Sequence, residues 1–234
     1  MKYINIIEGN FISRPNRFIA KVLINGKEEM AHVKNTGRCK ELLTDNAKVY
    51  LEDFEGRMGT RKMRYSLIGV EKNNLLINMD SQAPNKVVEE ALCSGKVILQ
   101  SMGELSTIKR EKTYGDSRFD FYLENKEGKR AFLEVKGVTL EENGVVRFPD
   151  APTERGVKHI NELIKAKAEG YSAYVFFVIQ MEGVKWFEPN NVTHAVFGQT
   201  LALAEKKGVH ILAYDCKVTR DTLILNDEVA IKLL

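Results

Sequence analysis

Two acids and a lysine stand in apolar, strand-like segments of this 234-residue chain. Asp120 lies in the aromatic run FDFY, and Glu134 and Lys136 lie in the apolar run AFLEVKGV. A charged side chain in a half-buried strand costs free energy unless something compensates it. Pairs of an acid and a lysine two residues apart also occur elsewhere, but only Glu134 combines an apolar strand with a facing acid.

The residue spacing predicts that the two acids face each other across a β-hairpin. If NKEGK forms the turn, centred on Glu127, Asp120 pairs with Glu134. Their Cβ atoms would then be about 4.5–5.5 Å apart. Lys136 shares the face of Glu134, because side chains two apart on a strand point the same way. A register shifted by one residue would turn Glu134 to the other face.

Two facing carboxylates repel each other, and a divalent cation bound between them would offset this repulsion. Mg²⁺ is typically held by one or two carboxylates together with waters and substrate phosphate. With Lys136 beside the attacking water and the phosphate, the arrangement suits metal-assisted phosphodiester hydrolysis. The alternative is an exposed edge hairpin in which Lys136 simply neutralises the acids.

Composition is that of an ordinary soluble protein, with 44% hydrophobic and 29% charged residues and a formal charge of +3. Cys39, Cys93 and Cys216 lack CxxC spacing, which argues against a zinc site and a disulfide framework. The N-terminus is too polar for a signal peptide, and no apolar run has the length of a membrane span. We therefore expect a cytoplasmic protein with no membrane partner.

Residues 1–82 predict a small OB-like β-barrel. Asn25-Gly26 joins two alternating runs in RFIAKVLINGKEEMAHV, which is a strong signal for a type I′ hairpin. Further short strands are expected in AKVYLEDF, RYSLIGVEK and LLINMD. About five strands in some 80 residues favour a closed barrel.

Residues 83–234 predict an α/β domain, so the whole chain is α+β. The expected elements are a helix in PNKVVEEALCSGKV, strands near 106–114, 118–124 and 131–139, a helix in TERGVKHINELIKAKAEG that stops at Gly170, a buried central strand in YSAYVFFVIQ, a helix in HAVFGQTLALAEKKG and a strand in VHILAY. Strand, helix and strand in that order imply a parallel crossover.

Three segments, SRFDFYL, AFLEVKGVTL and RFPDAPTERGVKHINELI, resemble in this order the sugar fermentation stimulation protein A family. The likeness extends to NTGRCKELL and GVHILAYDCKV and so covers nearly the whole chain. The resemblance implies an OB-like domain followed by a restriction-endonuclease-like mixed-sheet domain of the PD-(D/E)xK type. It also implies DNA binding of low sequence specificity.

Carried onto this chain, the nuclease motif falls on Asp120, Glu134 and Lys136, with Mg²⁺ or Mn²⁺ as the metal. The superfamily often adds a glutamate from a preceding helix, and Glu90 is the candidate metal ligand. Glu89 and Glu111 are its rivals. The proline that begins the motif is absent, because Phe119 stands before Asp120.

The helix that opens at TERGVKHINEL is the first expected contact for nucleic acid. Thr153 or Asp150 could cap it, and the free N–H groups of a helix start attract phosphate. Arg155, Lys158 and His159 project from its first turns, with Lys158 and His159 flanking the apolar stripe and remaining partly accessible. The alternative is a solvated helix face on which basic residues happen to cluster.

The second expected contact is the NTGRCKELL segment of the barrel. Thr36 and Gly37 could approach a phosphate or sugar closely, beside the charges of Arg38 and Lys40. Phe18 and Tyr65 are candidate stacking platforms for bases, and both could equally be core residues.

These observations leave more than one function open. The first is a metal-dependent nuclease. The second, implied by the family name, is a non-catalytic DNA-binding regulator of sugar (maltose-type) metabolism genes on a nuclease-like fold. Hydrolysis of a small phosphorylated substrate is a third. Nucleases of the superfamily often act as dimers, so a homodimer is a further expectation, although no dimer surface can be identified in the sequence.

Overall fold

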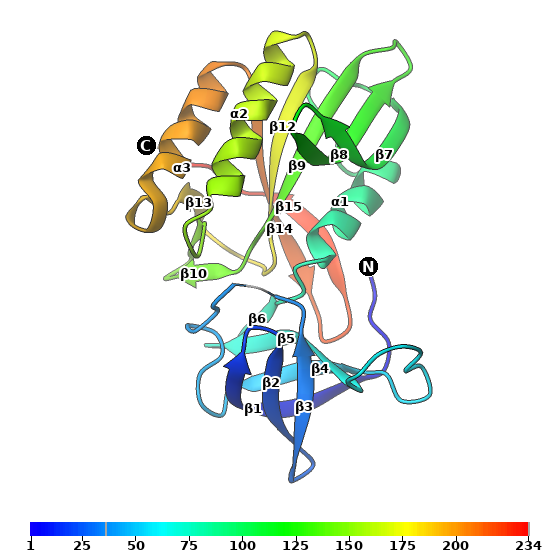
Figure 1. Cartoon of the computed structure of the whole chain (residues 1–234), viewed down its shortest axis with the longest axis vertical. Helices are drawn as coiled ribbons and strands as arrows, with labels where there is room; N and C mark the ends of the chain where they lie inside the picture. Colours follow the sequence, from blue (N-terminus) through cyan, green and yellow to red (C-terminus); the bar gives the residue numbers. More distant parts are fainter. Residues whose placement is uncertain (36, 234) are drawn as a thin grey trace.

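The computed structural model describes residues 1–35 and 37–233, which form a β-barrel (lower part of Figure 1) and an α/β domain above it. The elements are β1 (Ile6–Asn16), β2 (Ile19–Ile24), β3 (Lys27–Val33), β4 (Lys48–Asp53), β5 (Tyr65–Lys72), β6 (Leu75–Asn78), α1 (Ala83–Cys93), β7 (Leu105–Tyr114), β8 (Ser117–Asn125), β9 (Arg130–Val138), β10 (Leu140–Glu142), β11 (Val145–Phe148), α2 (Glu154–Ala168), β12 (Ser172–Ile179), β13 (Trp186–Pro189), α3 (Asn191–Lys206), β14 (His210–Val218) and β15 (Leu223–Glu228).

The N-terminal domain is the predicted OB-type barrel. Strand β1 pairs with β2 and β4, β2 with β3, and β4 with β5, while a parallel pairing of β3 with β5 closes five strands into a ring. Closure leaves no free sheet edge among these five strands. Asn25 and Gly26 have φ angles of 49° and 78°, the positive values that a type I′ turn needs.

The C-terminal domain is built on a mixed sheet with the strand order β15-β14-β12-β9-β8-β7. Strand β12 lies in the middle, parallel to both β9 and β14. Its alternate residues Val175 and Phe177 pack with α2 and α3, whereas Tyr174 and Phe176 pack with α1 on the opposite face. Burial on both faces explains the continuous apolar run, and the predicted central strand and parallel crossover are confirmed.

The helices begin where their capping residues stand. In α2 the Thr153 side chain accepts a hydrogen bond from the Gly156 N–H, so Thr153 and not Asp150 is the cap. Helix α3 begins earlier than the predicted start at His194, because the Asn190 side chain caps an extra turn. The backbone of His194 departs from helical geometry, which joins that turn to the helix at a kink.

A small sheet of β10, β11 and β13 is an addition that the sequence did not predict. Each of these strands has only three or four residues, which is too few to show an alternating pattern.

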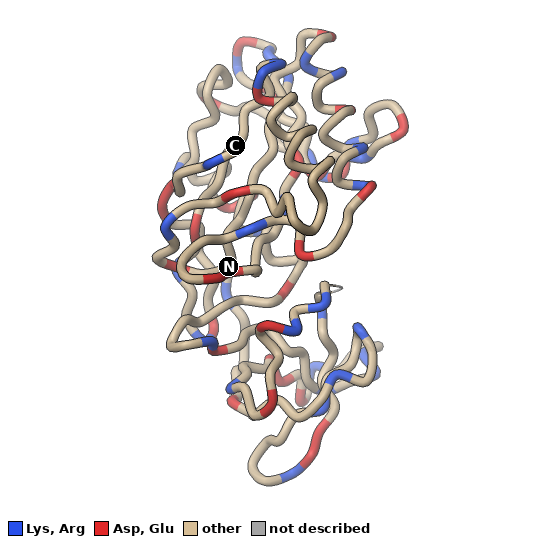
Figure 2. The backbone as a smooth tube through the Cα atoms, turned by 90° about the vertical axis from the view of Figure 1, so that its left-hand side faces the viewer, with Lys and Arg blue, Asp and Glu red and all other residues tan. Residues whose placement is uncertain are grey.

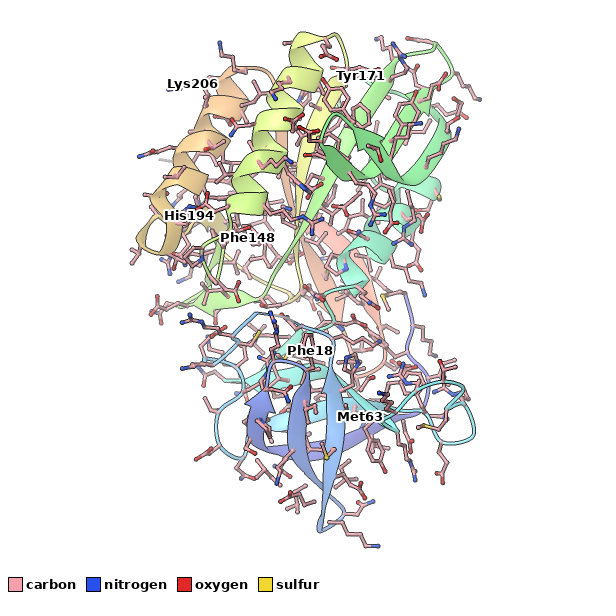
Figure 3. The ribbon with its side chains drawn as sticks, viewed as in Figure 1. Phe18, Met63, Phe148, Tyr171, His194 and Lys206 are labelled. Carbon is pink, nitrogen blue, oxygen red and sulfur yellow. The ribbon has the colours of Figure 1, made fainter. Side chains whose placement is uncertain are left out.

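A buried polar network and a shared core join the two domains. The Gln180 Nε2 atom donates to Asn78 Oδ1 at 2.9 Å and to the Asp80 carbonyl at 3.1 Å. Asn78 Nδ2 in turn donates to the Tyr3 hydroxyl at 3.0 Å. One hydrophobic cluster runs from the barrel interior to the α2 and α3 side of the sheet. In Figure 3, Phe148 marks the end of the upper domain near the barrel, and Phe18 the facing end of the barrel.

Charges of both signs are interspersed along the chain in both domains (Figure 2), in keeping with the small net charge of +3. Any recognition of an anionic partner therefore depends on local groups of basic residues. Among residues 1–35 and 37–233 no helix has the length and apolar character needed to cross a bilayer.

Candidate functional site

The hairpin of β8 and β9 has the predicted register. Phe121 pairs with Leu133 and Tyr122 with Phe132, and continuing this register sets Asp120 opposite Glu134. The regular pairing of the two strands ends at Phe121. Beyond it, β9 continues along β12 as far as Val138.

Asp120 occupies the point at which the two strands separate. Its Oδ2 atom accepts a hydrogen bond from the Val135 N–H at 2.8 Å, in the place of a strand carbonyl. The alternation of β8 also breaks here, because Phe119 packs in the cluster under α2 while Phe121 packs in the cluster under α1. As a result the Asp120 carboxylate also reaches α1, where Asn85 Nδ2 donates to its Oδ1 at 2.9 Å.

Glu134 is 3% exposed, and its two carboxylate oxygens have different surroundings. Oε1 accepts from Lys136 Nζ at 2.6 Å and lies 2.5 Å from His159 Nδ1. Oε2 is buried and meets no hydrogen-bond donor among residues 1–35 and 37–233. A buried carboxylate oxygen without a partner is costly, so this atom is available for a cation or a water.

The pKa values of the two acids are moved in opposite directions. Burial, followed by the negative charge of Glu134, raises the pKa of Asp120. Burial also acts to raise the pKa of Glu134, but the hydrogen bond from His159 and the positive charge of Lys136 outweigh it, and the pKa falls. Glu134 is thus held ionised. For Asp120, the hydrogen bonds from Val135 and Asn85 and the positive charge of Lys136 do not outweigh burial and the charge of Glu134.

His159 is buried at 5% exposure, which differs from the expected partial accessibility on the helix surface. Its Nδ1 lies against Glu134, and Arg155 Nε donates to its Nε2 at 3.4 Å. Because a guanidinium can only donate, Nε2 is the acceptor in this contact, and Nδ1 is the nitrogen that donates to Glu134 Oε1. His159 therefore orients Glu134 and does not present itself to a surface ligand.

The other two basic residues expected at the start of α2 are on the surface. Arg155 and Lys158 are exposed, and Lys158 Nζ donates to the carbonyl of Asp116 at 3.0 Å. Thr153, Arg155 and His159 come from the first two turns of one helix, so its start lies beside the hairpin acids.

The glutamates considered as a third acidic ligand have other partners. Glu90 Oε2 lies 2.6 Å from the N-terminal amino group of Met1. Glu89 pairs with Arg110 and Glu111 with Arg118. Helix α1 contributes Asn85 to the site instead, a residue that the sequence reasoning missed although it directly follows Pro84 at the helix start. In the described part of the chain no three or more His, Cys, Asp or Glu side chains gather to hold a metal.

The residues present nevertheless fit a hard divalent cation. Asp120 and Glu134 supply two carboxylates, and Glu134 Oε2 is unpartnered among the residues that the structure describes. Mg²⁺ usually keeps several waters and takes only one or two protein carboxylates, so a larger cluster of acids is not required.

The loop after β3 reaches the C-terminal domain at the junction. Arg38 and Lys40 are exposed there, whereas Thr36 lies outside the described residues. A Cβ atom on Gly37 would be 2.4 Å from Asp150 Oδ2, so the group that approaches Gly37 in this structure is a carboxylate and not a phosphate. Arg14 holds the loop by donating to the carbonyls of Asn35 and Gly37.

The two candidate stacking residues of the barrel differ in exposure. Tyr65 is a core residue. Phe18 is 47% exposed, lies at the end of the barrel nearest the upper domain (Figure 3), and has the Arg17 guanidinium 5.1 Å from its ring centre. Of the pair, only Phe18 remains a candidate for contact with a base.

Comparisons with known proteins agree along the whole chain. Residues 12–79 match a family described as the SfsA N-terminal OB domain, and residues 82–222 match the sugar fermentation stimulation protein RE domain. A sugar fermentation stimulation protein homolog of Desulfitobacterium hafniense (strain DSM 10664 / DCB-2) is 58% identical over 236 residues, covering 100% of this chain and 99% of the relative. The homolog of Clostridium beijerinckii is 55% identical, with 100% of both chains covered.

A solved structure is also similar over nearly its full length. The SfsA structure of Pyrococcus furiosus, described as a complex with Ca²⁺, superposes with a TM-score of 0.88 at 28% identity. The match covers 99% of this chain and 98% of the other.

Proposed function

The chain belongs to the sugar fermentation stimulation protein family, and we propose that it is a DNA-binding nuclease that uses Mg²⁺ or Mn²⁺ at Asp120, Glu134 and Lys136. The reaction is hydrolysis of a phosphodiester bond. The observation that carries the proposal is the buried Oε2 of Glu134, which meets no donor among the described residues and belongs to the acid opposite Asp120.

The cation would be held by the Asp120 carboxylate and by Glu134 Oε2. Such an ion supplies a water of lowered pKa and offsets charge on the phosphoryl oxygens. The Ca²⁺ named for the Pyrococcus furiosus relative supports a hard, oxygen-liganded cation, since Ca²⁺ and Mg²⁺ share that ligand preference. A bound cation also compensates the repulsion between the two acids, which otherwise helps to raise the pKa of Asp120.

The remaining side chains of the site would hold the two carboxylates in place and stabilise the negative charge of the phosphate. Lys136 Nζ, held 2.6 Å from Glu134 Oε1, carries a positive charge at the same end of the hairpin, where it would hold the attacking water and the scissile phosphate. His159 occupies the other approach to Oε1 and so fixes the Glu134 carboxylate with Oε2 free of both contacts. Asn85 and the Val135 N–H fix Asp120 in the same way.

Basic residues from both domains would hold the DNA backbone. Arg155 and Lys158 are exposed at the start of α2, and Arg38 and Lys40 are exposed on the barrel loop. Phosphate contacts of this kind carry little sequence information, and they release counterions, so affinity should fall steeply with salt.

The experiment is cleavage of labelled single-stranded, double-stranded and branched DNA with Mg²⁺ or Mn²⁺. We expect wild-type protein to cut, and Glu134→Gln and Lys136→Ala to lose about 10²–10³-fold or more in rate, the order found when a charge-stabilising group is removed. Both variants should bind DNA within a few-fold of wild type. Glu127→Gln and Lys129→Ala, which change the same residue types in the exposed turn of the same hairpin, are the matched controls and should cut normally.

DNA binding without cleavage would support the alternative function, a non-catalytic DNA-binding regulator. If wild type binds every DNA form yet cuts none, and neither Mg²⁺, Mn²⁺ nor Ca²⁺ changes its thermal stability, the acids are structural. The protein would then act as a non-catalytic DNA-binding protein on a nuclease-like fold.

A further inference from the structure

A cavity of about 200 Å³ lies at the junction of the two domains, next to the proposed active site. It begins at Gly137, the residue after Lys136, and the barrel loop forms its opposite wall through Asn35 and Gly37. At roughly 30 Å³ per water, the cavity has the volume of about six or seven water molecules. It can therefore take one ring system beside the hairpin acids.

One wall presents the amide of Gln180, which is 1% exposed. Its Nε2 donates to Asn78 Oδ1 and to the Asp80 carbonyl, which fixes the orientation of the amide. Oε1 then lies on the other side, where a Cβ atom on Gly137 would be only 2.6 Å away. A buried, oriented acceptor therefore lines the cavity.

Two glycines of the lining are each approached closely by an acceptor oxygen. Gly137 does not have a positive φ angle, so backbone geometry does not demand glycine at this position. Added Cβ atoms would instead collide with acceptor oxygens, at 2.4 Å from Asp150 Oδ2 for Gly37 and at 2.6 Å from Gln180 Oε1 for Gly137. The missing side chains thus let these two oxygens approach the glycine backbone closely, and the residues that carry them, Asp150 and Gln180, both line the cavity.

An aromatic ring and a guanidinium complete the lining. Phe148 lines the cavity and is held by the rings of Phe177 and Phe197, with centroids at 5.8 and 5.2 Å. Arg147 is fixed at the rim by Glu188 and Glu142, at 2.7 and 3.0 Å. An aromatic face together with two acceptors matches a flat ring that carries N–H donors.

We propose that this cavity receives a single unpaired nucleobase that carries an amino group, next to the phosphate at the hairpin site. The proposal rests on the nuclease function proposed above and adds to it the form of the substrate. A base inside a duplex cannot enter, so the preferred substrate is single-stranded or locally unpaired nucleic acid. A phosphate does not fit, because the Asp150 carboxylate and the Gln180 oxygen are both acceptors.

The test scans a single-stranded oligonucleotide by replacing one base at a time with an abasic residue. Binding is measured by fluorescence anisotropy with the full-length Glu134→Gln variant, so that cleavage does not interfere. We expect one position to weaken binding by about fivefold or more, the size of a lost base contact, while its neighbours change little. When added to the Glu134→Gln variant, Asp150→Ala should weaken binding of the intact strand. It should also reduce the loss of affinity that the abasic residue causes at the sensitive position. Asp45→Ala, at an exposed aspartate of the barrel, should change neither.

Each other outcome has a definite meaning. If the protein binds and wild type cuts, but the abasic scan is flat, the base site is wrong and the nuclease proposal stands. If free deoxyguanosine monophosphate binds more tightly than the oligonucleotide, the cavity serves a small nucleotide and the proposal is overturned. If no oligonucleotide binds at all, both proposals fail together.

Discussion

The Nδ1 atom of His159 lies 2.5 Å from Glu134 Oε1, and Arg155 Nε approaches the opposite ring nitrogen. The ring is therefore held from both sides, and it fixes which carboxylate oxygen of Glu134 stays unpartnered among the described residues. Groups that orient a metal ligand in this way tune metal affinity, although they never touch the metal.

At the residue scale we predict that His159→Asn weakens metal affinity by about 10–100-fold, the usual effect of losing such an orienting group. The measurement is DNA cleavage as a function of Mg²⁺ concentration, in which the rate should largely recover at high metal. Lys158→Ala is the control from the same turn and should instead weaken DNA binding and reduce its salt dependence. A His159→Asn variant with an unchanged metal requirement would contradict the positioning role.

The arrangement of the charged side chains on the hairpin could be predicted, because side chains two residues apart on a strand lie on the same face. The burial of His159 against Glu134 was not predicted. The sequence places His159 at the margin of the apolar stripe of the helix, whereas in the structure the helix buries His159 together with Ile160 and Leu163. A polar ring inside a buried stripe, four residues before Leu163, is the signal that would have indicated a partner in the sheet.

At the scale of elements, the start of α2 places Arg155 and His159 beside the hairpin. The Thr153 hydroxyl caps this start at 3.0 Å from the Gly156 nitrogen. We predict that Thr153→Ala lowers the free energy of unfolding by about 1 kcal/mol, as loss of an N-cap does. Urea unfolding at neutral pH measures this.

Thr153→Ser keeps the hydroxyl and should remain close to the wild-type stability. If the alanine and serine variants unfold at the same urea concentration as wild type, the cap does not stabilise the helix.

Strands and helices long enough to show a regular apolar pattern could be predicted from the sequence. Side-chain directions that depend on contacts between distant parts of the chain could not. Strand β12 and the hairpin of β2 and β3 have unmistakable patterns, and both form as expected. The direction of Glu90 depends on the roll of α1 against the sheet and on the amino group of Met1, a contact across 89 residues. A sequence pattern shows which face of a helix is apolar but not which distant group meets its polar side.

At the scale of the whole molecule, the proposed base site exists only while the barrel and the C-terminal domain keep their relative placement. Lys72 of β5 and Glu141 of β10 form an ion pair across the junction at 2.9 Å. Glu141 Oε1 also accepts from the Gly144 N–H at 2.6 Å. Burial acts to raise the pKa of Glu141, but this hydrogen bond and Lys72 outweigh it and lower the pKa.

This lowered pKa makes the contribution of the pair depend on pH in a definite direction. A carboxyl group that binds its proton less readily when folded stabilises the protein above its unfolded pKa, about 4.3 for glutamate. That stabilisation is lost as the pH falls through the lower, folded pKa. We predict that Glu141→Gln lowers the free energy of unfolding at neutral pH by up to about 1 kcal/mol, the range of a partly exposed ion pair.

Urea unfolding of wild type and Glu141→Gln from neutral to acid pH tests this, since the difference between them should shrink towards zero below the ordinary glutamate range. Glu205→Gln, at an exposed position of α3, should follow the wild-type curve throughout. A constant difference at every pH would mean that packing, and not the charge of Glu141, holds this part of the junction. In that case acid should leave the placement of the two domains, and with it the abasic-site preference in DNA binding, unchanged.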